Sequence, residues 1–107
     1  MAAGSMDPPG GVSHDSEAGR FELELEEGRA YLRYRLEGGV MDLVSTWVPP
    51  AHRHGGIGER VVLAALEHAR TQGYRVIPTC PFVSHVLAAN LRYADLVEKG
   101  SGGSEPG

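Results

Sequence analysis

The sequence predicts an α+β domain in which two main helices pack on a small, mostly antiparallel sheet. Three segments before residue 49 alternate apolar and polar residues, as half-exposed strands do. One long segment with apolar residues at helical spacing follows, and after it come a short strand and a second helix. The length of 107 residues favours a single domain.

The three leading strands are expected at residues 21–25, 30–36 and 40–48. Turns rich in glycine and glutamate separate them, so that the three strands run antiparallel. The third segment is the most apolar of the three, which indicates a more central place in the sheet. Pro49 and Pro50 end it, because proline cannot donate a hydrogen bond to a neighbouring strand.

The two helices are expected at residues 58–72 and 82–90. The apolar stripe of the first consists of Val61, Val62, Ala65, Leu66 and Ala69. Gly73 is suited to the end of that helix, and Pro81 to the first turn of the second. Between the helices, residues 74–77 form a short strand that is expected to lie parallel to the third.

Both ends of the chain are expected to be disordered, at residues 1–19 and 98–107. They are rich in Gly, Pro, Ser and Ala, and cannot bury enough apolar surface to offset the entropy of ordering. The folded domain then spans residues 20–97, a size at which a single core is marginal. A ligand or a second copy would add stability by mass action, and we expect a monomer or a weak dimer.

Composition excludes several classes of protein. The net charge of −4 argues against a nucleic acid as partner, and no apolar run is long enough to span a membrane. A single cysteine excludes an intramolecular disulfide, and no signal peptide is visible, so a cytoplasmic location is expected. His52 and His54 have no further metal-ligating neighbour, so no metal site is expected.

A basic, glycine-rich loop from Val48 to Gly58 joins the third strand to the first helix. Glycines let a backbone approach a ligand closely, and the first N–H groups of a helix are unpaired donors at the positive end of its dipole. The spacing Arg53-x-x-Gly56-x-Gly58 is neither the G-x-G-x-x-G dinucleotide pattern nor the lysine-bearing P-loop. The loop is therefore a candidate site for a phosphate or pyrophosphate, and an ordinary tight turn is the alternative.

The same spacing matches the coenzyme A loop of GNAT acetyltransferases, which reads [Gln/Arg]-x-x-Gly-x-[Gly/Ala]. The order of elements resembles the C-terminal half of the GNAT fold, and residues 21–97 resemble the short, single-domain N-acetyltransferase-like family of the YjdJ type. The segments that carry the resemblance are Thr46–Pro49, Arg53–Gly58, Val76–Val83 and Tyr93–Val97. Departures from the family pattern lie at Ser45-Thr46, where the family often has His-Thr, and at Asn90-Leu91-Arg92-Tyr93, where it often has His-Pro-Glu-Tyr.

The resemblance implies acetyl-coenzyme A (acetyl-CoA) as the ligand and transfer of its acetyl group to an amine as the activity. The residues implied in holding the pyrophosphate are Arg53, His54, Gly55, Gly56, Ile57 and Gly58. In GNAT folds the strands before the loop and after the helix splay apart, and the pantetheine arm pairs with backbone there, around Trp47 and Val48 in this chain. Asn90 is a further candidate for contact with the cofactor, and core packing is the alternative for Trp47 and Val48.

Three residues are candidates for the chemistry. Cys80 precedes a helix that begins at Pro81, and the helix dipole there can lower the pKa of a thiol. It would accept the acetyl group as a nucleophile, or line the acetyl pocket, or be an inert buried residue. Direct transfer needs a base and an acid, for which His85 and Tyr93 are the candidates, with a surface role and core packing as their alternatives.

Two functions from different classes follow from these residues. The first is an N-acetyltransferase that acts on an amine, with polyamine, protein N-terminus, lysine and small amine all open. The second is a non-catalytic module that binds coenzyme A or acyl-CoA, because the chain lacks the N-terminal helical part that builds much of the acceptor site in full-length GNAT proteins.

Overall fold

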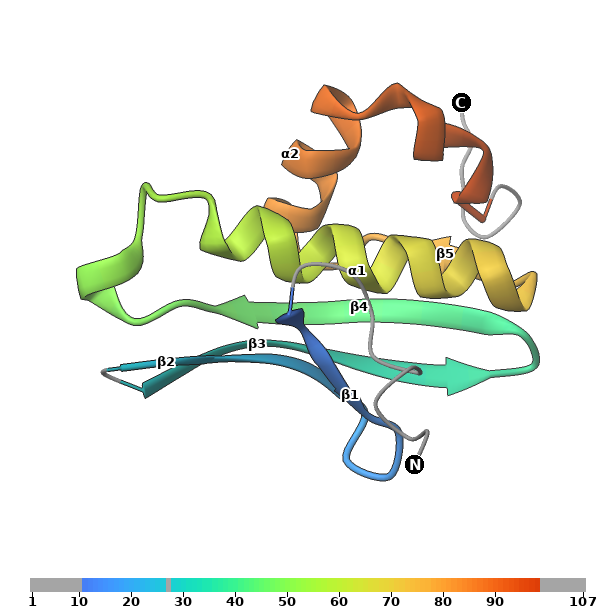
Figure 1. Ribbon diagram of the computed structural model, residues 1–107. Helices are drawn as coiled ribbons and strands as arrows, with labels where there is room; N and C mark the ends of the chain where they lie inside the picture. The colour runs from blue at the N-terminus through green and yellow to red at the C-terminus, as the bar shows by residue number, and fades with distance from the viewer. Residues whose placement is uncertain (1–10, 27, 99–107) are drawn as a thin grey trace.

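The computed structural model describes residues 11–26 and 28–98, which form a five-stranded sheet with the helices on one side of it (Figure 1). The sheet order follows the chain, β1-β2-β3-β4-β5. Its strands are β1 (Ser13–Asp15), β2 (Arg20–Leu25), β3 (Gly28–Glu37), β4 (Val40–Trp47) and β5 (Arg75–Ile77). The first four are antiparallel and β5 is parallel to β4, which confirms the expected α+β class.

Helix α1 (Ile57–Gln72) lies along the inner face of the sheet. Its predicted stripe is fully buried, and it meets the inward residues of three strands: Phe21, Leu23, Ala30, Leu32, Met41 and Leu43. Burying each of the larger of these side chains, the alanines excepted, contributes about 1.5–3 kcal/mol. The packing fixes the line of α1 and therefore the place where its first turn begins.

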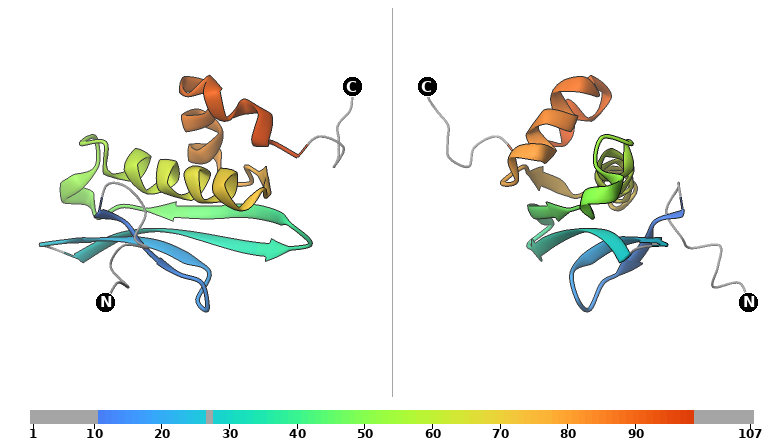
Figure 2. Two further views of the ribbon diagram at one scale, coloured as in Figure 1. Left: turned by 45° about the vertical axis from the view of Figure 1, so that its right-hand side comes forward. Right: turned by 90° about the vertical axis from the view of Figure 1, so that its left-hand side faces the viewer.

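Helix α2 (Pro81–Ala89) follows β5, and a 3-10 segment, Leu91–Leu96, follows α2. The two views of Figure 2 show both segments on the same side of the sheet as α1. Val83, Val86 and Leu87 bury the inner face of α2. Both predicted helices are present, with ends that differ by one residue from those expected.

Residues 12–19 correct one expectation, because they are ordered rather than disordered. Val12 is fully buried, and β1 pairs antiparallel with β2, with His14 opposite Phe21. Composition missed this strand because a single apolar side chain anchors it within a polar segment. Of the other residues of the expected N-terminal tail, Gly11 is described, and residues 1–10 lie outside the described residues.

The expected C-terminal tail is described only at its first residue. The Glu98 N–H donates a hydrogen bond of 2.7 Å to the Val76 carbonyl, and Val97 forms a parallel bridge with Val76. The rest of that tail, residues 99–107, lies outside the described part of the chain.

A β-bulge in β4 shapes the end of the sheet where the glycine-rich loop begins. Arg33 of β3 lies opposite Ser45, whereas the next residue, Tyr34, lies opposite Leu43. Val44 is thus an extra residue without a partner in β3. Bulges bend a strand and increase its twist, and this one lies where β4 and β5 part.

Candidate functional site

Strand β4 pairs with the parallel strand β5 only over its first three residues. Residues Val40–Asp42 pair with Arg75–Ile77, and one further hydrogen bond of 2.9 Å runs from the Cys80 N–H to the Leu43 carbonyl. Among the described residues, no strand continues the pairing along residues 44–47 on this side of β4. The bulged end of β4 therefore leaves a stretch of backbone open toward α2.

The glycine-rich loop ends in backbone that only glycine adopts readily. Gly56 precedes α1 with φ of 82°, and His54 also has a positive φ of 73°. No side chain among the described residues caps the first turn of α1. The N–H groups of that turn thus remain available to an anion, and the helix dipole favours negative charge there.

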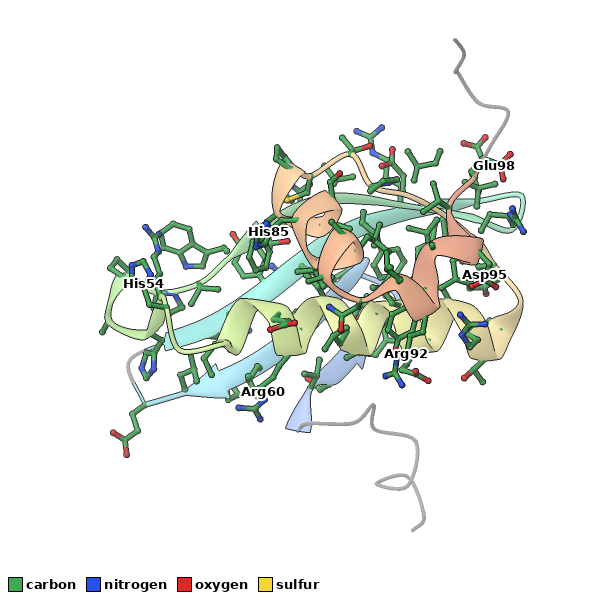
Figure 3. All side chains as sticks on the ribbon, turned by 90° about the horizontal axis from the view of Figure 1, so that it is seen from above. His54, Arg60, His85, Arg92, Asp95 and Glu98 are labelled. Carbon is green, nitrogen blue, oxygen red and sulfur yellow. The ribbon has the colours of Figure 1, made fainter. Side chains whose placement is uncertain are left out.

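A cavity of about 590 Å³ lies between this loop, the end of β4 and one face of α2. Its walls include Trp47, Val48, Arg53, His54, Gly56 and Gly58, all predicted as site residues, together with the candidate base His85. Figure 3 shows His54 and His85 toward the same end of α1. The structure thus brings together seven of the residues that the sequence singled out.

Gly58 is the point of closest approach in this cavity. A Cβ atom built on Gly58 would lie 3.0 Å from the ring of Phe82 and 3.2 Å from a methyl group of Val48. The second glycine of the motif therefore allows α1, α2 and the residue after β4 to meet closely beside the cavity.

Arg53 and Trp47 contact each other at one edge of the cavity. The Arg53 Nε–H donates a hydrogen bond of 2.8 Å to the Val48 carbonyl, and the guanidinium lies 4.8 Å from the centre of the Trp47 ring. Such cation–π contact contributes about 0.5–1 kcal/mol at exposed sites. Trp47 is 43 % exposed, which places it at the surface of the site and not in the core.

Asn90 lies behind the cavity wall rather than in it. Its side-chain amide donates a hydrogen bond of 2.8 Å to the Val86 carbonyl and another of 3.3 Å to the Glu59 carboxylate. Both of those residues line the cavity. Asn90 thus ends α2 and holds Glu59, and any effect it has on a ligand passes through these two neighbours.

Cys80 is buried at the start of α2, beside the open end of β4. Its Sγ lies 3.6 Å from the Thr46 hydroxyl, and Thr46 lines the cavity. Burial raises the pKa of the thiol, but hydrogen bonds from the Thr46 hydroxyl and from the backbone of Val83, Phe82 and Thr46 outweigh it, so that the pKa is lowered. The predicted position before a helix is confirmed, and the local field favours the thiolate.

Tyr93 lies apart from these residues. Its ring is fully buried, and its hydroxyl donates to the Glu67 carboxylate and accepts a hydrogen bond of 2.7 Å from Arg92. Burial and the hydrogen bond with Glu67 raise the pKa of this hydroxyl. Tyr93 does not line the cavity, and its buried ring and hydrogen bonds are compatible with the packing role that was the alternative to catalysis.

Sequence reasoning missed several residues of the cavity, above all Phe82 and Glu59. Phe82, His85, Val86 and Ala89 follow one another at spacings of three, one and three, so that one face of α2 lines the cavity. That spacing is visible in the sequence, but it predicts only an apolar face. Whether this face of α2 turns toward the cavity depends on how α2 packs against the rest of the domain.

Comparison with known proteins agrees with this geometry. The family model described as GCN5-related N-acetyl-transferase matches residues 20–96. Protein NATD1 of Bos taurus is 32 % identical over 82 residues, which cover 74 % of this chain and 73 % of that protein. Protein NATD1 of Mus musculus is 30 % identical over 82 residues, which cover 74 % of this chain and 74 % of that protein.

The fold also matches a solved structure. A GCN5-like protein of Staphylococcus aureus, determined by solution NMR, superimposes with a TM-score of 0.64 at 22 % identity, over 88 % of this chain and 95 % of the other. The YjdJ type within the family stays a prediction. On its fold and on the match over residues 20–96, the chain belongs to the GCN5-related N-acetyltransferase family.

Proposed function

We propose that the chain binds acetyl-CoA in the loop cavity and transfers the acetyl group to an amine. The observation that carries the proposal is the uncapped first turn of α1, which opens onto a cavity of about 590 Å³ that reaches the open end of β4. The family generally uses acetyl-CoA, which supports the same ligand.

Each part of the cofactor has a matching feature in the cavity. The pyrophosphate would accept hydrogen bonds from the backbone of residues 54–58, with the charge of Arg53 nearby. The amides of the pantetheine arm would pair with the open backbone of residues 44–47. The thioester would then lie near Thr46 and Cys80.

Cys80 is our proposed nucleophile. Its thiolate would attack the acetyl carbonyl, form an S-acetyl bond and release coenzyme A as a thiolate, which takes up a proton. The free amine of the acceptor would then attack the acetyl carbonyl and form the amide bond, the S-acetyl bond would break with release of the Cys80 thiolate, and the nitrogen would lose its second proton to solvent. His85 lines the same cavity and is our proposed base for removing the proton from the ammonium form of the acceptor.

Calorimetric titration with acetyl-CoA and coenzyme A tests the site. Gly56→Trp would fill the cavity mouth, and Gly73→Trp is its matched control, because both glycines have φ near 80° with nothing within 4 Å of a Cβ. We expect both ligands to bind the wild type and the control, and binding to be lost in Gly56→Trp. Equal binding by the two variants would rule out the loop as the cofactor site.

Turnover with a panel of amines tests the chemistry. Cys80→Ala should abolish transfer, and mass spectrometry of the wild type with acetyl-CoA alone should detect acetylated Cys80. Normal turnover in Cys80→Ala would leave direct transfer as the mechanism. Tight binding of acetyl-CoA without turnover on any amine would favour the non-catalytic binding module.

A further inference from the structure

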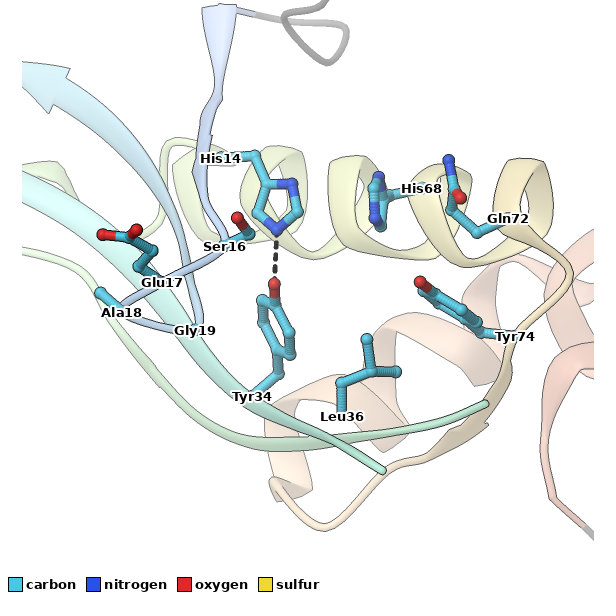
Figure 4. Close-up of a pocket in the computed structure, with 10 residues that line it drawn as sticks. All are labelled: His14, Ser16, Glu17, Ala18, Gly19, Tyr34, Leu36, His68, Gln72 and Tyr74. Carbon is cyan, nitrogen blue, oxygen red and sulfur yellow. Dashed lines mark hydrogen bonds between the residues drawn. The ribbon is translucent and has the colours of Figure 1, made fainter. Parts of the chain in front are cut away.

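A second cavity lies at the other end of α1, with a volume of about 700 Å³ (Figure 4). This volume is within the range of small-molecule sites. Its walls come from the turn between β1 and β2, the end of β3 and the C-terminal half of α1, and it shares no lining residue with the loop cavity. His68, on its wall, lies roughly 15 Å along the helix from Gly58, at 1.5 Å per residue.

Four of the ten lining residues carry rings, and these rings contact one another. The His14 ring stacks on buried Phe21 with centroids 4.2 Å apart and planes 1° from parallel. Its Nε2 is hydrogen-bonded to the Tyr34 hydroxyl, and its edge meets His68 at 4.5 Å. Tyr74 closes the far side, 6.0 Å from His68. A ligand would therefore meet rings that are already oriented.

The charge of this aromatic cavity is negative. Glu17 is one of its lining residues, at the rim, whereas no lysine or arginine lines it among the described residues. Asp15 lies close by, and its carboxylate accepts a hydrogen bond of 3.0 Å from the Ala18 N–H, which shapes the turn that carries Glu17. Burial lowers the pKa of both His14 and His68, and the charge of His68 lowers the pKa of His14 further, so neither ring offsets Glu17 at neutral pH.

We propose that the aromatic cavity binds a small organic cation, an alkylammonium or quaternary ammonium compound. Ring faces attract a cation, and Glu17 adds a full opposite charge. An anion would meet that carboxylate with no cationic side chain to offset it. The proposal goes beyond acetyl transfer and does not depend on it, because the two cavities are separate.

Choline and its uncharged isostere 3,3-dimethyl-1-butanol test the proposal by NMR titration of the full chain. The two molecules have nearly the same shape, so that a difference in affinity reports the charge. We expect choline to bind at least tenfold more tightly than the alcohol. Equal affinity of the two, or no binding of choline at tens of millimolar, would overturn the proposal.

Variants of the wall locate the binding. Tyr74→Ala should weaken choline binding at least tenfold. Tyr31→Ala should leave it unchanged, because the Tyr31 ring lies on the outer face of the sheet. Glu17→Gln should weaken choline binding several-fold. It should not unfold the domain, because Glu17 is exposed. Glu26→Gln, which removes a charge elsewhere, is the control. Choline affinity unchanged in both Tyr74→Ala and Glu17→Gln would refute this site.

Titration with acetyl-CoA separates this test from that of the loop cavity. The Glu17→Gln variant should bind acetyl-CoA as the wild type does. Loss of choline binding with acetyl-CoA binding intact would therefore concern the aromatic cavity alone.

Discussion

At Cys80, burial and hydrogen bonding act on one thiol in opposite directions. Burial disfavours the thiolate, whereas the Thr46 hydroxyl and the first backbone N–H groups of α2 favour it, and the second effect is larger. The helix provides its donors because Pro81 starts it directly after the cysteine. Thr46 adds a donor from a different strand, which no sequence spacing would have linked to Cys80.

Removing the Thr46 hydroxyl should raise the pKa of Cys80. In Thr46→Val, which keeps the shape of the side chain, less thiolate is present at neutral pH and alkylation by iodoacetamide should slow several-fold. The measurement is the alkylation rate as a function of pH, with Ser45→Ala as the control. An unchanged pH profile in Thr46→Val would show that the hydroxyl does not set the thiol's reactivity.

Gly19 and Gly38 allow the cost of a close contact to be separated from that of backbone conformation. Both have positive φ, 70° and 60°, but a Cβ on Gly19 would lie 2.7 Å from the Tyr34 carbonyl, whereas a Cβ on Gly38 would meet nothing within 4 Å. Gly38→Ala should therefore lower the free energy of unfolding by roughly 1 kcal/mol, because left-handed backbone is unfavourable for a residue with a side chain. Gly19→Ala should lower the free energy of unfolding by about 1–3 kcal/mol more, because the Tyr34 carbonyl must move to make room for the methyl group.

Urea unfolding of the two alanine variants measures this difference. Because Gly19 is the last residue of the β1–β2 turn, the larger loss also tests whether residues 12–19 belong to the folded domain. Equal losses would mean that the turn is not held against Tyr34.

Among the elements, α1 serves both cavities. Its first turn lines the loop cavity, and its last two turns carry His68 and Gln72 into the aromatic cavity. The helix was predictable because its apolar stripe is long and periodic. Strand β1 was not, because three residues are too few for a pattern, and the bulge at Val44 was not, because it exists only in the register between two strands.

Contact between β1 and α1 should make stability depend on pH. Burial lowers the pKa of His14, and the charge of His68 lowers it further, while burial also lowers the pKa of His68. Below about pH 6.5, the unfolded chain therefore binds more protons than the folded chain. The free energy of unfolding should be highest above that pH and should fall on acidification.

The midpoint of urea unfolding between pH 5.5 and 8 measures this effect. In His68→Gln, which cannot gain a proton, the decrease toward acid should be smaller than in the wild type. The same decrease in both proteins would assign the pH dependence to other groups.

For the molecule as a whole, the small core makes ligand binding a large part of the stability. At a hundredfold excess over Kd, a ligand adds about 2.7 kcal/mol. In a domain of this size, each kcal/mol raises Tm by about 4–8 °C, so acetyl-CoA should raise Tm by roughly 10–20 °C.

A thermal shift assay with acetyl-CoA and with ATP checks this prediction. The rise should be absent in Gly56→Trp and present in Gly73→Trp. A similar rise with ATP would point to a general anion site at the start of α1.

The sequence predicts the site at the level of its loop but not of its cavity. Residues 53–58 could be singled out as a candidate loop because a strand, a glycine-rich turn and a helix follow one another in the chain, and four of the six line the cavity. The contribution of Phe82 and Glu59, and the position of Tyr93 away from the cavity, depend on how α2 and residues 91–96 pack against α1. The family match establishes the fold over residues 20–96 and leaves these particulars to the structure.

The short outer strands have a consequence for the behaviour of the protein at high concentration. Sheets aggregate when a long edge is free to pair with another chain, and both outer strands here, β1 and β5, have only three residues. The open backbone at residues 44–47 is the exception, and it is the stretch that we assign to the cofactor. An occupied site would therefore also cover the edge through which one molecule can pair with the next, and coenzyme A should slow aggregation during concentration and storage.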